Sequence, residues 1–393
     1  MKLLLVTNLF PTPYDPERGV FTLQLAKRLQ KHCKVTVICP LPWFPNFKFL
    51  HSVNKWLQYS QVPEKYEIEG ISVYSPKYFV IPKLSENFHA SLMSHGIFSC
   101  IKKLHCKEKF DAINSQWFYP DSVAVDKIIK TLNIPHIPTG LGSDINREMQ
   151  SPVKHKMIIN MLQNSDAITV VSNNLKKELI NHGIDNKKVS VIPNGIDTEK
   201  FKILNKKECR KRLNLTLEHP MILYVGRLSE EKSITTLIKA MHHLKTNNTS
   251  VTAYILGEGR LLDDLQSETI TLGLEDNIHF IGKVEHDEVG TWMGATDYLC
   301  LPSVMEGCPN VILEALGSGR PVIASTVGAI PDIVTDQSGI LFTPENVSEL
   351  SNAINQAIDK EWNEDEILKS VELLSWEHAA ENYYNVFKSI ITQ

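Results

Sequence analysis

Two glutamates, Glu306 and Glu314, lie eight positions apart within the stretch 302–321. Pro309 stands between them, and because proline is favoured at the first position of a helix, the sequence predicts a helix that begins there. At 3.6 residues per turn, eight residues correspond to about 80° of rotation, so both carboxylates can lean toward one cleft. Carboxylate oxygens accept hydrogen bonds from sugar and ribose hydroxyls. The spacing therefore favours a site for such hydroxyls.

Backbone groups around this predicted helix start add a second kind of chemistry. The amides of Gly307, Asn310 and Val311 are placed to bind phosphate oxygens, since the first N–H groups of a helix lack a partner within it and carry partial positive charge. Two solvated surface charges are the alternative for an isolated glutamate pair. The neighbouring glycine, proline and helix start favour a functional site instead.

Two cations follow an apolar run at 221–225, and a glycine turn separates them from it. Arg227 offers a planar fork for phosphate oxygens and Lys232 a compact point charge. In open α/β sheets ligands bind beyond the carboxyl ends of the strands, which is where these residues fall. Solvated charges are again the alternative, and the acidic character of the surrounding half disfavours it.

The first half holds two weaker candidates, each at a strand-to-helix turn. Gly19 closes a proline-containing loop over residues 8–19, and a glycine there lets backbone approach a phosphate, although ordinary scaffolding explains it equally. Ser143 and Asp144 are acceptor-side candidates. Capping of a helix over 145–150 stays open as their alternative role.

Short β-branched runs alternate with amphipathic stretches along the whole chain, which predicts parallel sheets covered by helices. The rhythm restarts in the second half, so we expect two Rossmann-like units. Turn residues at 193–195, before a charged stretch, place the boundary near 193–205. The segment 376–391 has a helical pattern beyond the last strand, and we expect it to pack back onto the first unit.

Composition excludes several classes of protein. With 393 residues, 42% hydrophobic and 22% charged, the chain is neither collagen-like, nor disordered, nor membrane-embedded. Its net charge of −4 conceals an asymmetry: residues 1–200 hold 25 Lys/Arg against 17 Asp/Glu, and residues 201–393 hold 16 against 28. The basic half favours an anionic surface or ligand, with solvated surface charge as the alternative.

Cysteine spacing and hydropathy indicate the expected cellular location of the protein. The seven cysteines include no C-x-x-C pair, so neither zinc nor a disulfide framework is predicted, and a reducing, cytoplasmic location is expected. The apolar stretch at the N-terminus is shorter than a signal peptide requires and predicts a first β-strand. No uncharged apolar run reaches the roughly 18 residues of a membrane span, so membrane contact would be peripheral.

Taken together, these segments resemble the family 4 retaining glycosyltransferases of GT-B fold. The resemblance rests on 224–232 with Arg227 and Lys232, on the Glu306-x7-Glu314 motif and on 321–332, and it extends to 191–197 and the helix at Trp376. It implies an α/β protein of two Rossmann-like domains facing across a cleft. Residues 1–195, with 375–393 packing back on them, would bind the acceptor, and residues 200–374 would bind a nucleotide-sugar donor.

The resemblance also implies roles for individual residues. Arg227 and Lys232 would neutralise the diphosphate leaving group, Glu314 would bind ribose hydroxyls, and Glu306 would contact the transferred sugar. Four residues would border the nucleotide pocket: Gly257, Glu258, Lys283 and Val284. Gly19 would bring loop backbone near the phosphates. The donor would be UDP- or GDP-linked, and no metal cofactor is expected.

Two positions depart from the family pattern. Gln116 stands where a histidine often contacts the donor sugar, and Leu141 stands where His or Arg is usual. Glutamine can hydrogen-bond a sugar hydroxyl but carries no charge. Gln116 therefore remains a candidate catalytic residue. Two alternative functions of the protein stay open: a nucleotide-sugar epimerase of the same fold, or a non-catalytic donor-binding partner subunit.

The expected function is retaining transfer of a sugar to a glycan or lipid-linked acceptor in surface polysaccharide or related glycoconjugate synthesis. The enzyme would work at the inner face of the cytoplasmic membrane. An aromatic loop at 41–50 and a basic amphipathic stretch at 88–109 are candidates for contact with anionic lipid, although an apolar helix face more often packs on a core. No RNA-recognition signature is present, so no nucleic acid partner is expected.

Overall fold

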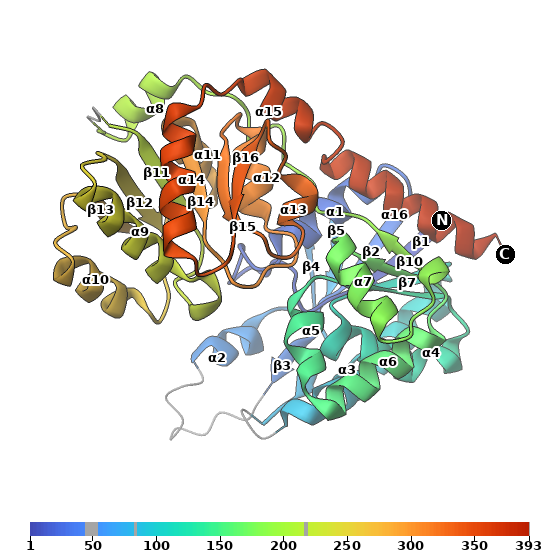
Figure 1. Cartoon of the computed structure of the whole chain (residues 1–393). Coiled ribbons are helices and arrows are strands. Elements are labelled where there is room, and N and C mark those ends of the chain that lie inside the picture. The colour runs from blue at the N-terminus through green and yellow to red at the C-terminus, as the bar shows by residue number, and fades with distance from the viewer. Residues whose placement is uncertain (44–53, 82–84, 216–218, 393) are drawn as a thin grey trace. The chain divides into compact units, whose positions relative to one another are not determined.

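The computed structural model describes residues 1–43, 54–81, 85–215 and 219–392, and the chain divides into two compact units (Figure 1). Unit 1 comprises Met1–Asn194 and Trp376–Gln393, and unit 2 comprises Gly195–Ser375. The expected α/β class with parallel sheets in two units is confirmed, as is the return of the C-terminal helix to the first unit.

Unit 1 is built on an eight-stranded sheet of order β10-β9-β8-β7-β1-β2-β5-β4. All neighbouring strands pair in parallel except β4 and β5, which form an antiparallel pair. The strands are β1 (Lys2–Val6), β2 (Lys34–Ile38), β4 (Lys65–Ile68), β5 (Ile71–Tyr74), β7 (Ala112–Gln116), β8 (His136–Gly140), β9 (Ile168–Val170) and β10 (Val189–Val191). A separate parallel pair consists of β3 (Leu41–Trp43) and β6 (Lys77–Phe79).

The helices of unit 1 cover this sheet. They are α1 (Val20–Leu29), α2 (Asn54–Gln61), α3 (His89–Glu108), α4 (Val123–Leu132), α5 (Ser143–Asn146), α6 (Pro152–Asn164), α7 (Asn173–Asn181) and α16 (Trp376–Ile391). The central strands are buried on both faces, which is why they consist of continuous apolar residues rather than alternating ones.

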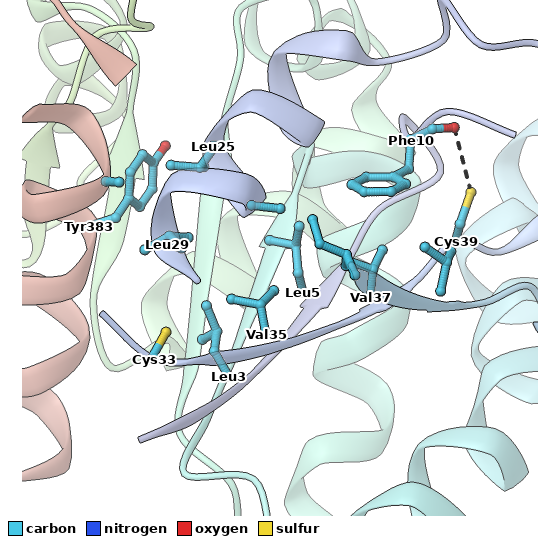
Figure 2. Close-up of a cluster of buried hydrophobic side chains, with 14 of the residues drawn as sticks. Leu3, Leu5, Phe10, Leu25, Leu29, Cys33, Val35, Val37, Cys39 and Tyr383 are labelled. Atoms are coloured by element: carbon cyan, nitrogen blue, oxygen red, sulfur yellow. Dashed lines mark hydrogen bonds between the residues drawn. The ribbon is translucent and has the colours of Figure 1, made fainter. Parts of the chain in front are cut away.

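One core cluster shows how α16 becomes part of unit 1 (Figure 2). Tyr383 and Phe387 of α16 lie in the same buried cluster as Leu25 and Leu29 of α1. An ion pair of 3.1 Å between Arg28 and Glu377 joins the same two helices. Apolar burial on this scale stabilises the contact by about 2 kcal/mol per large side chain. The C-terminal helix is therefore an integral element of the unit.

Unit 2 contains a six-stranded, fully parallel sheet of order β13-β12-β11-β14-β15-β16. Its strands are β11 (Met221–Val225), β12 (Thr252–Leu256), β13 (Ile278–Gly282), β14 (Tyr298–Leu301), β15 (Val322–Ser325) and β16 (Gly339–Phe342). Its helices are α8 (Lys206–Arg212), α9 (Ile234–Thr246), α10 (Leu262–Thr271), α11 (His286–Ala295), α12 (Asn310–Gly317), α13 (Ile330–Ile333), α14 (Val347–Asp359) and α15 (Glu364–Ser370).

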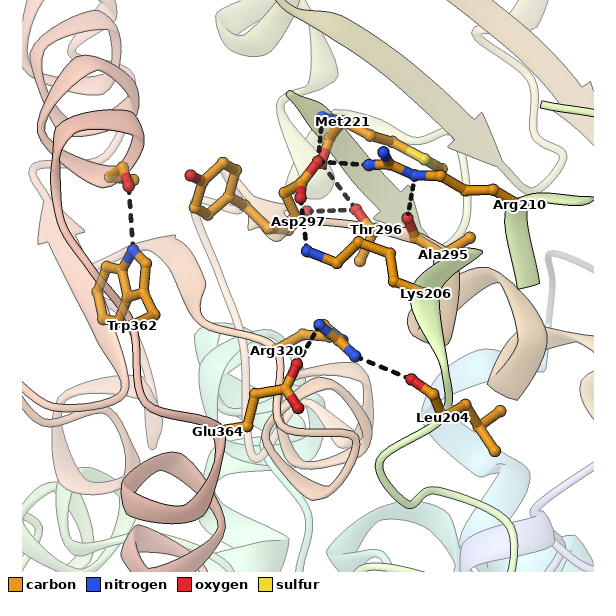
Figure 3. A network of polar contacts seen from close by, with 12 residues as sticks. Leu204, Lys206, Arg210, Met221, Ala295, Thr296, Asp297, Arg320, Trp362 and Glu364 are labelled. Carbon is orange, nitrogen blue, oxygen red and sulfur yellow. Dashed lines mark hydrogen bonds and ion pairs between the residues drawn. The ribbon is translucent and has the colours of Figure 1, made fainter. Parts of the chain in front are cut away.

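A polar network ties α8 to the amino ends of β11 and β14 (Figure 3). The Asp297 carboxylate accepts hydrogen bonds of 2.7 Å from Lys206, from Arg210 and from the Met221 backbone N–H. Nearby, the buried Arg320 pairs with Glu364 at 2.7 Å and donates to the Leu204 carbonyl. These contacts fix the segment that enters unit 2 onto its sheet.

Several sequence expectations need refinement. The antiparallel β4 and the small β3–β6 pair lack the long apolar pattern of the central strands, so sequence reasoning missed β3, β4 and β6. The apolar face of α3 packs on the core: Met93, Ile97 and Ile101 are fully buried, whereas Phe88 before the helix is 64% exposed. Of the aromatic loop, residues 44–50 lie outside the described part of the chain. Within the described part, no helix has the length and apolar content needed to cross a membrane.

Five of the seven cysteines are buried, whereas Cys106 is exposed and Cys100 is partly exposed. All seven are free thiols, and Cys39 and Cys300 are fully buried. Burial raises the pKa of Cys39 to about 12 and that of Cys300 further still. Neither thiol is therefore set up as a nucleophile.

Candidate active site

Each sheet contains one point where the strand order reverses. In unit 2 the chain runs outward from β11 to β12 and β13 and then returns to β14 on the other side of β11. In open α/β sheets, ligands bind beyond the carboxyl ends of the strands at such a switch point. The candidate segments of unit 2 follow β11, β12, β13 and β14, so the fold brings them all to this one edge.

An ion pair joins the two strands at the switch point. Lys232, in the loop after β11, donates to Glu306 Oε1, in the loop after β14, at 2.6 Å. Their side chains are only 16% and 9% exposed. Because the pair is largely shielded from water, its Coulomb attraction is stronger than that of a surface pair. The structure therefore places a cation and a carboxylate side by side at the expected ligand edge.

The loop that carries Glu306 is held from several sides. Ser303 Oγ donates to Glu306 Oε1 at 2.6 Å, and the Val304 N–H donates to the Glu231 carbonyl at 2.9 Å. Gly328, with φ +58°, passes beneath the loop, and a Cβ there would lie 2.5 Å from the Glu306 carbonyl oxygen. Glu306 is thus preorganised by its surroundings before any ligand arrives.

Helix α12 begins directly after this loop. Pro309 is its N-cap in an extended conformation, with φ −72° and ψ 112°, so the helix starts at Asn310 and the expected first helical position for the proline is wrong by one residue. No side chain caps this N-terminus. The N–H groups of Asn310 and Val311 lie in the first turn, where a phosphate oxygen would be favoured by the helix dipole.

Glu314 lies one turn into α12 and faces a histidine. Its Oε1 is 3.5 Å from Nε2 of His286, the first residue of α11, and its side chain is 15% exposed. The second carboxylate of the motif therefore has its own partner, distinct from the Lys232 that contacts Glu306. The two glutamates are therefore held by different partners.

Arg227 is the most exposed member of the set. Its side chain is 79% exposed and contacts Glu231 at 3.3 Å, one helical turn along the chain. Such a contact is worth little in water, so the guanidinium can turn toward an anion at small cost. The Tyr224 hydroxyl donates to the Arg227 carbonyl at 2.8 Å and fixes the backbone beneath this mobile head group.

The loops after β11 and β12 pack backbone to backbone. Gly257 has φ +135°, and a Cβ there would lie 1.9 Å from the Gly226 carbonyl oxygen. The Leu228 N–H donates to the Glu258 carbonyl at 3.0 Å. Lys283 and Val284 follow β13 at the same edge, and Lys283 is exposed. A glycine is thus required at position 257 because the backbone of Gly226 approaches it closely. Its loop lies beside the loop that carries Arg227.

In unit 1 the corresponding switch point, between β1 and β7, is closed by a buried contact. The Asp121 carboxylate accepts hydrogen bonds from the Asn8 backbone N–H at 2.5 Å and from the Asn8 side chain at 2.8 Å. Burial raises the pKa of Asp121 to about 8, against the opposing effect of the Asn8 N–H. Gly19, with φ +61°, is the N-cap of α1, and a Cβ there would lie 2.1 Å from the Leu9 carbonyl oxygen. Loop packing alone therefore requires this glycine.

Gln116 ends β7 and is 1% exposed. Its side-chain nitrogen donates to Asn114 Oδ1 at 2.8 Å, so the amide is anchored to its own strand. Contact with a sugar would have to use the remaining hydrogen-bonding capacity of the group. Gln116 lies at the carboxyl edge of its sheet, at the position where the family often has a histidine. Its amide is held by the hydrogen bond to Asn114.

Ser143 and Asp144 open the short helix α5. Asp144 is fully buried, and its carboxylate accepts from the N–H groups of Phe118, Leu141, Gly142 and Ile145 at 2.8–3.2 Å. These contacts clamp the turn after β8, which supports the structural alternative for Asp144 over an acceptor contact. Ser143 is exposed.

Sequence reasoning missed three residues of this constellation: Ser303, His286 and Lys200. Ser303 directly follows β14 and its proline, a position that could have been flagged from the strand end alone. His286 opens a helix just past β13, which is a similar signal. Lys200 contacts the His286 ring from 86 positions away in the chain, and no local pattern announces it.

The arrangement in unit 2 can hold an anionic, hydroxyl-bearing ligand. Cationic groups (Arg227, Lys232) and first-turn amides suit phosphate oxygens, and the two carboxylates suit hydroxyls. Among the residues that the structure describes, no group of three or more His, Cys, Asp or Glu side chains is arranged to hold a metal ion.

Comparison with known proteins agrees with this geometry. A family model described as Glycosyltransferase Family 4 matches residues 19–200, and one described as Glycosyl transferases group 1 matches residues 205–370. TuaC of Bacillus subtilis strain 168, a glycosyltransferase assigned to teichuronic acid biosynthesis, is 30% identical over 364 residues, which is 91% of this chain and 89% of TuaC.

Two solved structures share the fold across nearly the whole chain. Sucrose-phosphate synthase from Thermosynechococcus elongatus has a TM-score of 0.81 at 19% identity, covering 100% of this chain and 99% of that one. Anabaena Alr3699/HepE in complex with UDP has a TM-score of 0.73 at 19% identity, covering 99% and 100%. The chain is a glycosyltransferase and belongs to family 4, with the GT-B fold.

Proposed function

We propose that this glycosyltransferase takes a sugar from a nucleotide-diphosphate donor and transfers it, with retention of configuration, to a glycan or lipid-linked acceptor. The observation that carries the proposal is the Lys232–Glu306 pair at the β11/β14 switch point, beside the uncapped N-terminus of α12. A cation, a carboxylate and first-turn amides converge where a nucleotide sugar presents a diphosphate next to sugar hydroxyls.

The diphosphate would be stabilised as it leaves. When the bond between the anomeric carbon and the phosphate oxygen breaks, negative charge builds on the diphosphate and positive charge on the sugar. Lys232 and Arg227, with the amides of Gly307, Asn310 and Val311, would neutralise the first charge. Because Glu306 and Ser303 already hold Lys232 and its loop in place, little reorganisation is needed during the reaction.

The two carboxylates would divide the donor between them. Glu306, which is paired with the phosphate-facing Lys232, would accept from hydroxyls of the transferred sugar. Glu314, one turn along α12, would accept from the ribose hydroxyls. The loops with Gly257 and Glu258 and with Lys283 and Val284 border the same edge of the sheet and would flank the base.

Retention follows if the acceptor hydroxyl attacks from the side that the diphosphate leaves. The new bond forms between acceptor oxygen and anomeric carbon, the old bond to the phosphate oxygen breaks, and that phosphate oxygen takes the acceptor proton. This scheme requires no side chain as general base. The tethered Gln116 is consistent with that, because an amide has no useful basicity.

The acceptor class is proposed from relatives. TuaC is assigned to teichuronic acid biosynthesis, and it aligns with nearly the whole of this chain. Surface polysaccharide or related glycoconjugate synthesis is therefore the proposed role.

The decisive experiment is a donor screen with product analysis. UDP-, GDP- and ADP-sugars are tested for a rise in melting temperature, because a ligand that binds only the folded state raises apparent stability. Donors that bind are then incubated with glycan and lipid-linked acceptors, and the anomeric configuration of the product is read by NMR. Glu306→Gln should abolish transfer, and Glu268→Gln on α10, whose contact to Lys239 is 4.0 Å, is the matched control.

Each failure of this screen has a distinct meaning. An inverted product would overturn the retaining mechanism, and an epimerised nucleotide sugar without transfer would point to the epimerase alternative. Donor binding without turnover by any acceptor would favour a non-catalytic donor-binding subunit.

A peripheral membrane contact is proposed through unit 1. Since the apolar face of α3 is buried, the contact would use exposed aromatic side chains instead: Trp43 is 40%, Phe79 41% and Phe88 64% exposed, and the rings of Trp43 and Phe79 lie 6.4 Å apart. The test is flotation with vesicles. Stronger recovery with anionic than with neutral vesicles, lost in Phe79→Ser/Phe88→Ser, supports the contact, and equal recovery contradicts it.

A further inference from the structure

In the proposed donor site, Glu314 has a partner on α11, the ring of His286. His286 lies between that carboxylate and a second charged residue: its Nε2 is 3.5 Å from Glu314 Oε1, and its Nδ1 contacts the Lys200 ammonium. All three residues belong to unit 2. The histidine therefore connects a carboxylate of the site to a lysine that sequence patterns do not link to it.

The chemistry of lysine decides which ring nitrogen carries the proton. An ammonium group has three donors and no acceptor, so the nitrogen it contacts must offer a lone pair. Nδ1 of His286 is that acceptor, and the neutral ring must then carry its hydrogen on Nε2. This is the nitrogen that faces Glu314. The Lys200 contact thus selects the tautomer that can donate to the carboxylate.

Packing fixes the plane of the ring as well. Phe201, next to Lys200 in the chain, meets the His286 ring edge-on with centroids 5.6 Å apart and an interplanar angle of 79°. Phe201 itself is 2% exposed. Lys200 is also held by Asp287 at 2.6 Å. The ring orientation and the tautomer together place the protonated Nε2 at 3.5 Å from Glu314 Oε1.

We infer that His286 is a positioning residue for Glu314: by engaging Oε1 it fixes the rotamer of the carboxylate and leaves Oε2 for a ribose hydroxyl. Lys200 acts one step further out, by holding the tautomer. The inference rests on the proposed function, because it deepens the role given there to Glu314. A rotating carboxylate would spend part of its time pointing away from the ligand, so fixing it strengthens hydroxyl binding.

The test compares nucleotides with and without ribose hydroxyls. The probe is whichever of UDP, GDP or ADP binds the wild type, set against its 2′,3′-dideoxy form by calorimetry. His286→Phe keeps the aromatic packing but removes the donor, and we expect the preference for the hydroxyl-bearing nucleotide to fall about fivefold to tenfold. His286→Gln, which retains an N–H donor, should restore part of it. His279→Phe, in a ring contact with Tyr254 on the same sheet, is the matched control and should leave the preference unchanged.

Coupling to Glu314 separates positioning from direct contact with the ligand. In a Glu314→Ala background, His286→Phe should have no further effect on the ribose preference, because the group it positions is gone. Independent, additive effects of the two substitutions would overturn the inference. So would an unchanged preference in folded His286→Phe while Glu314→Ala abolishes it; that result leaves the proposed function standing.

Two further outcomes complete the design. If no nucleoside diphosphate binds, or if the wild type does not distinguish the dideoxy form, the proposed role of Glu314 fails and the inference fails with it. The tautomer is measured without any ligand from the ¹⁵N shifts of the His286 ring. We expect hydrogen on Nε2 in the wild type and a mixture of tautomers in Lys200→Met, and hydrogen on Nδ1 in the wild type would overturn the inference.

Discussion

The two ends of one strand pair, β11 and β14, carry the same chemistry and use it differently. At the amino ends, Asp297 binds Lys206, Arg210 and a backbone N–H, each at 2.7 Å. At the carboxyl ends, Glu306 binds Lys232 at 2.6 Å. Both clusters are carboxylate–cation contacts of similar length between segments far apart in sequence, so distance alone does not distinguish a structural pair from a functional one.

What differs is what else surrounds each carboxylate. The donors at Asp297 engage both of its oxygens and include the first N–H of β11, so the group completes the sheet and ties α8 to it. At Glu306 the side chains of Lys232 and Ser303 both donate to Oε1, and the loop leads directly into the start of α12. In open α/β sheets, ligands also bind among the loops that follow the carboxyl ends of the strands. Position at the carboxyl edge of the sheet, rather than the ion pair, marks the site.

The same carboxylate-to-amide change at both ends is the strongest way to break this comparison. Glu306→Gln should lower kcat/KM for transfer by about 100-fold or more, because a charged contact to the reacting sugar and the partner of Lys232 are lost together. The free energy of unfolding should fall by about 1–2 kcal/mol, because Lys232 loses its charged partner while Ser303 can still bond the new amide. Steady-state kinetics and urea denaturation measure the two quantities. Retained transfer with a large loss of stability would place Glu306 with Asp297 as a structural residue.

Asp297→Asn should show the opposite result. Replacing a carboxylate that is 20% exposed and holds two cations should cost about 2–4 kcal/mol of folding free energy, because Lys206 and Arg210 lose their common partner. Turnover per folded molecule should stay within about twofold. Hydrogen exchange should accelerate first in α8 and at the start of β11. An intact exchange pattern there would contradict the structural role.

The cluster at the carboxyl ends of the strands could be predicted from the sequence, and the cluster at the amino ends could not. The strands, the switch-point loops and the cations after β11 have local signals: apolar runs, a glycine turn and charges just past a strand end. Glu306 and Glu314 are eight positions apart, a spacing that predicts both carboxylates on one side of the site. Asp297, in contrast, follows a helix as one more acidic residue in an acidic half, and its partners Lys206 and Arg210 lie about ninety positions away.

The sequence left some roles open and missed others for one physical reason. For Asp144 both a substrate contact and a capping role stayed open, and the fold shows that four backbone N–H groups donate to its carboxylate. The contact between Lys200 and His286 likewise exists only once the segment entering unit 2 folds onto α11. Local sequence patterns do not show which polar groups form hydrogen bonds with residues far away in the chain. These hydrogen bonds decide which candidate residues remain available to a ligand.

An exposed cation sharpens the comparison further. Arg227→Gln should leave the free energy of unfolding unchanged within about 0.5 kcal/mol, because the side chain is 79% exposed and has a single surface contact. Its loss should lower kcat/KM for the donor about tenfold, through one charged contact to the diphosphate. Arg212→Gln, exposed at the end of α8, is the control with the same chemical change and should alter neither. Unchanged donor kinetics in Arg227→Gln would remove Arg227 from the site.

The smallest effect separates the two lysines. Lys206→Met should cost only about 0.5–1 kcal/mol of folding free energy, because Lys206 is 36% exposed and Asp297 keeps Arg210 and the Met221 N–H. Turnover should not change. Lys232→Met, at a contact of nearly the same length, should instead reduce transfer, and its loss of stability should exceed that of Lys206→Met because Glu306 is only 9% exposed. Thermal melts and initial rates on the two variants test this directly. Equal kinetic effects would mean that the two ends of the β11/β14 pair are not functionally distinct, because only Lys232 lies at the edge of the sheet where the donor is proposed to bind.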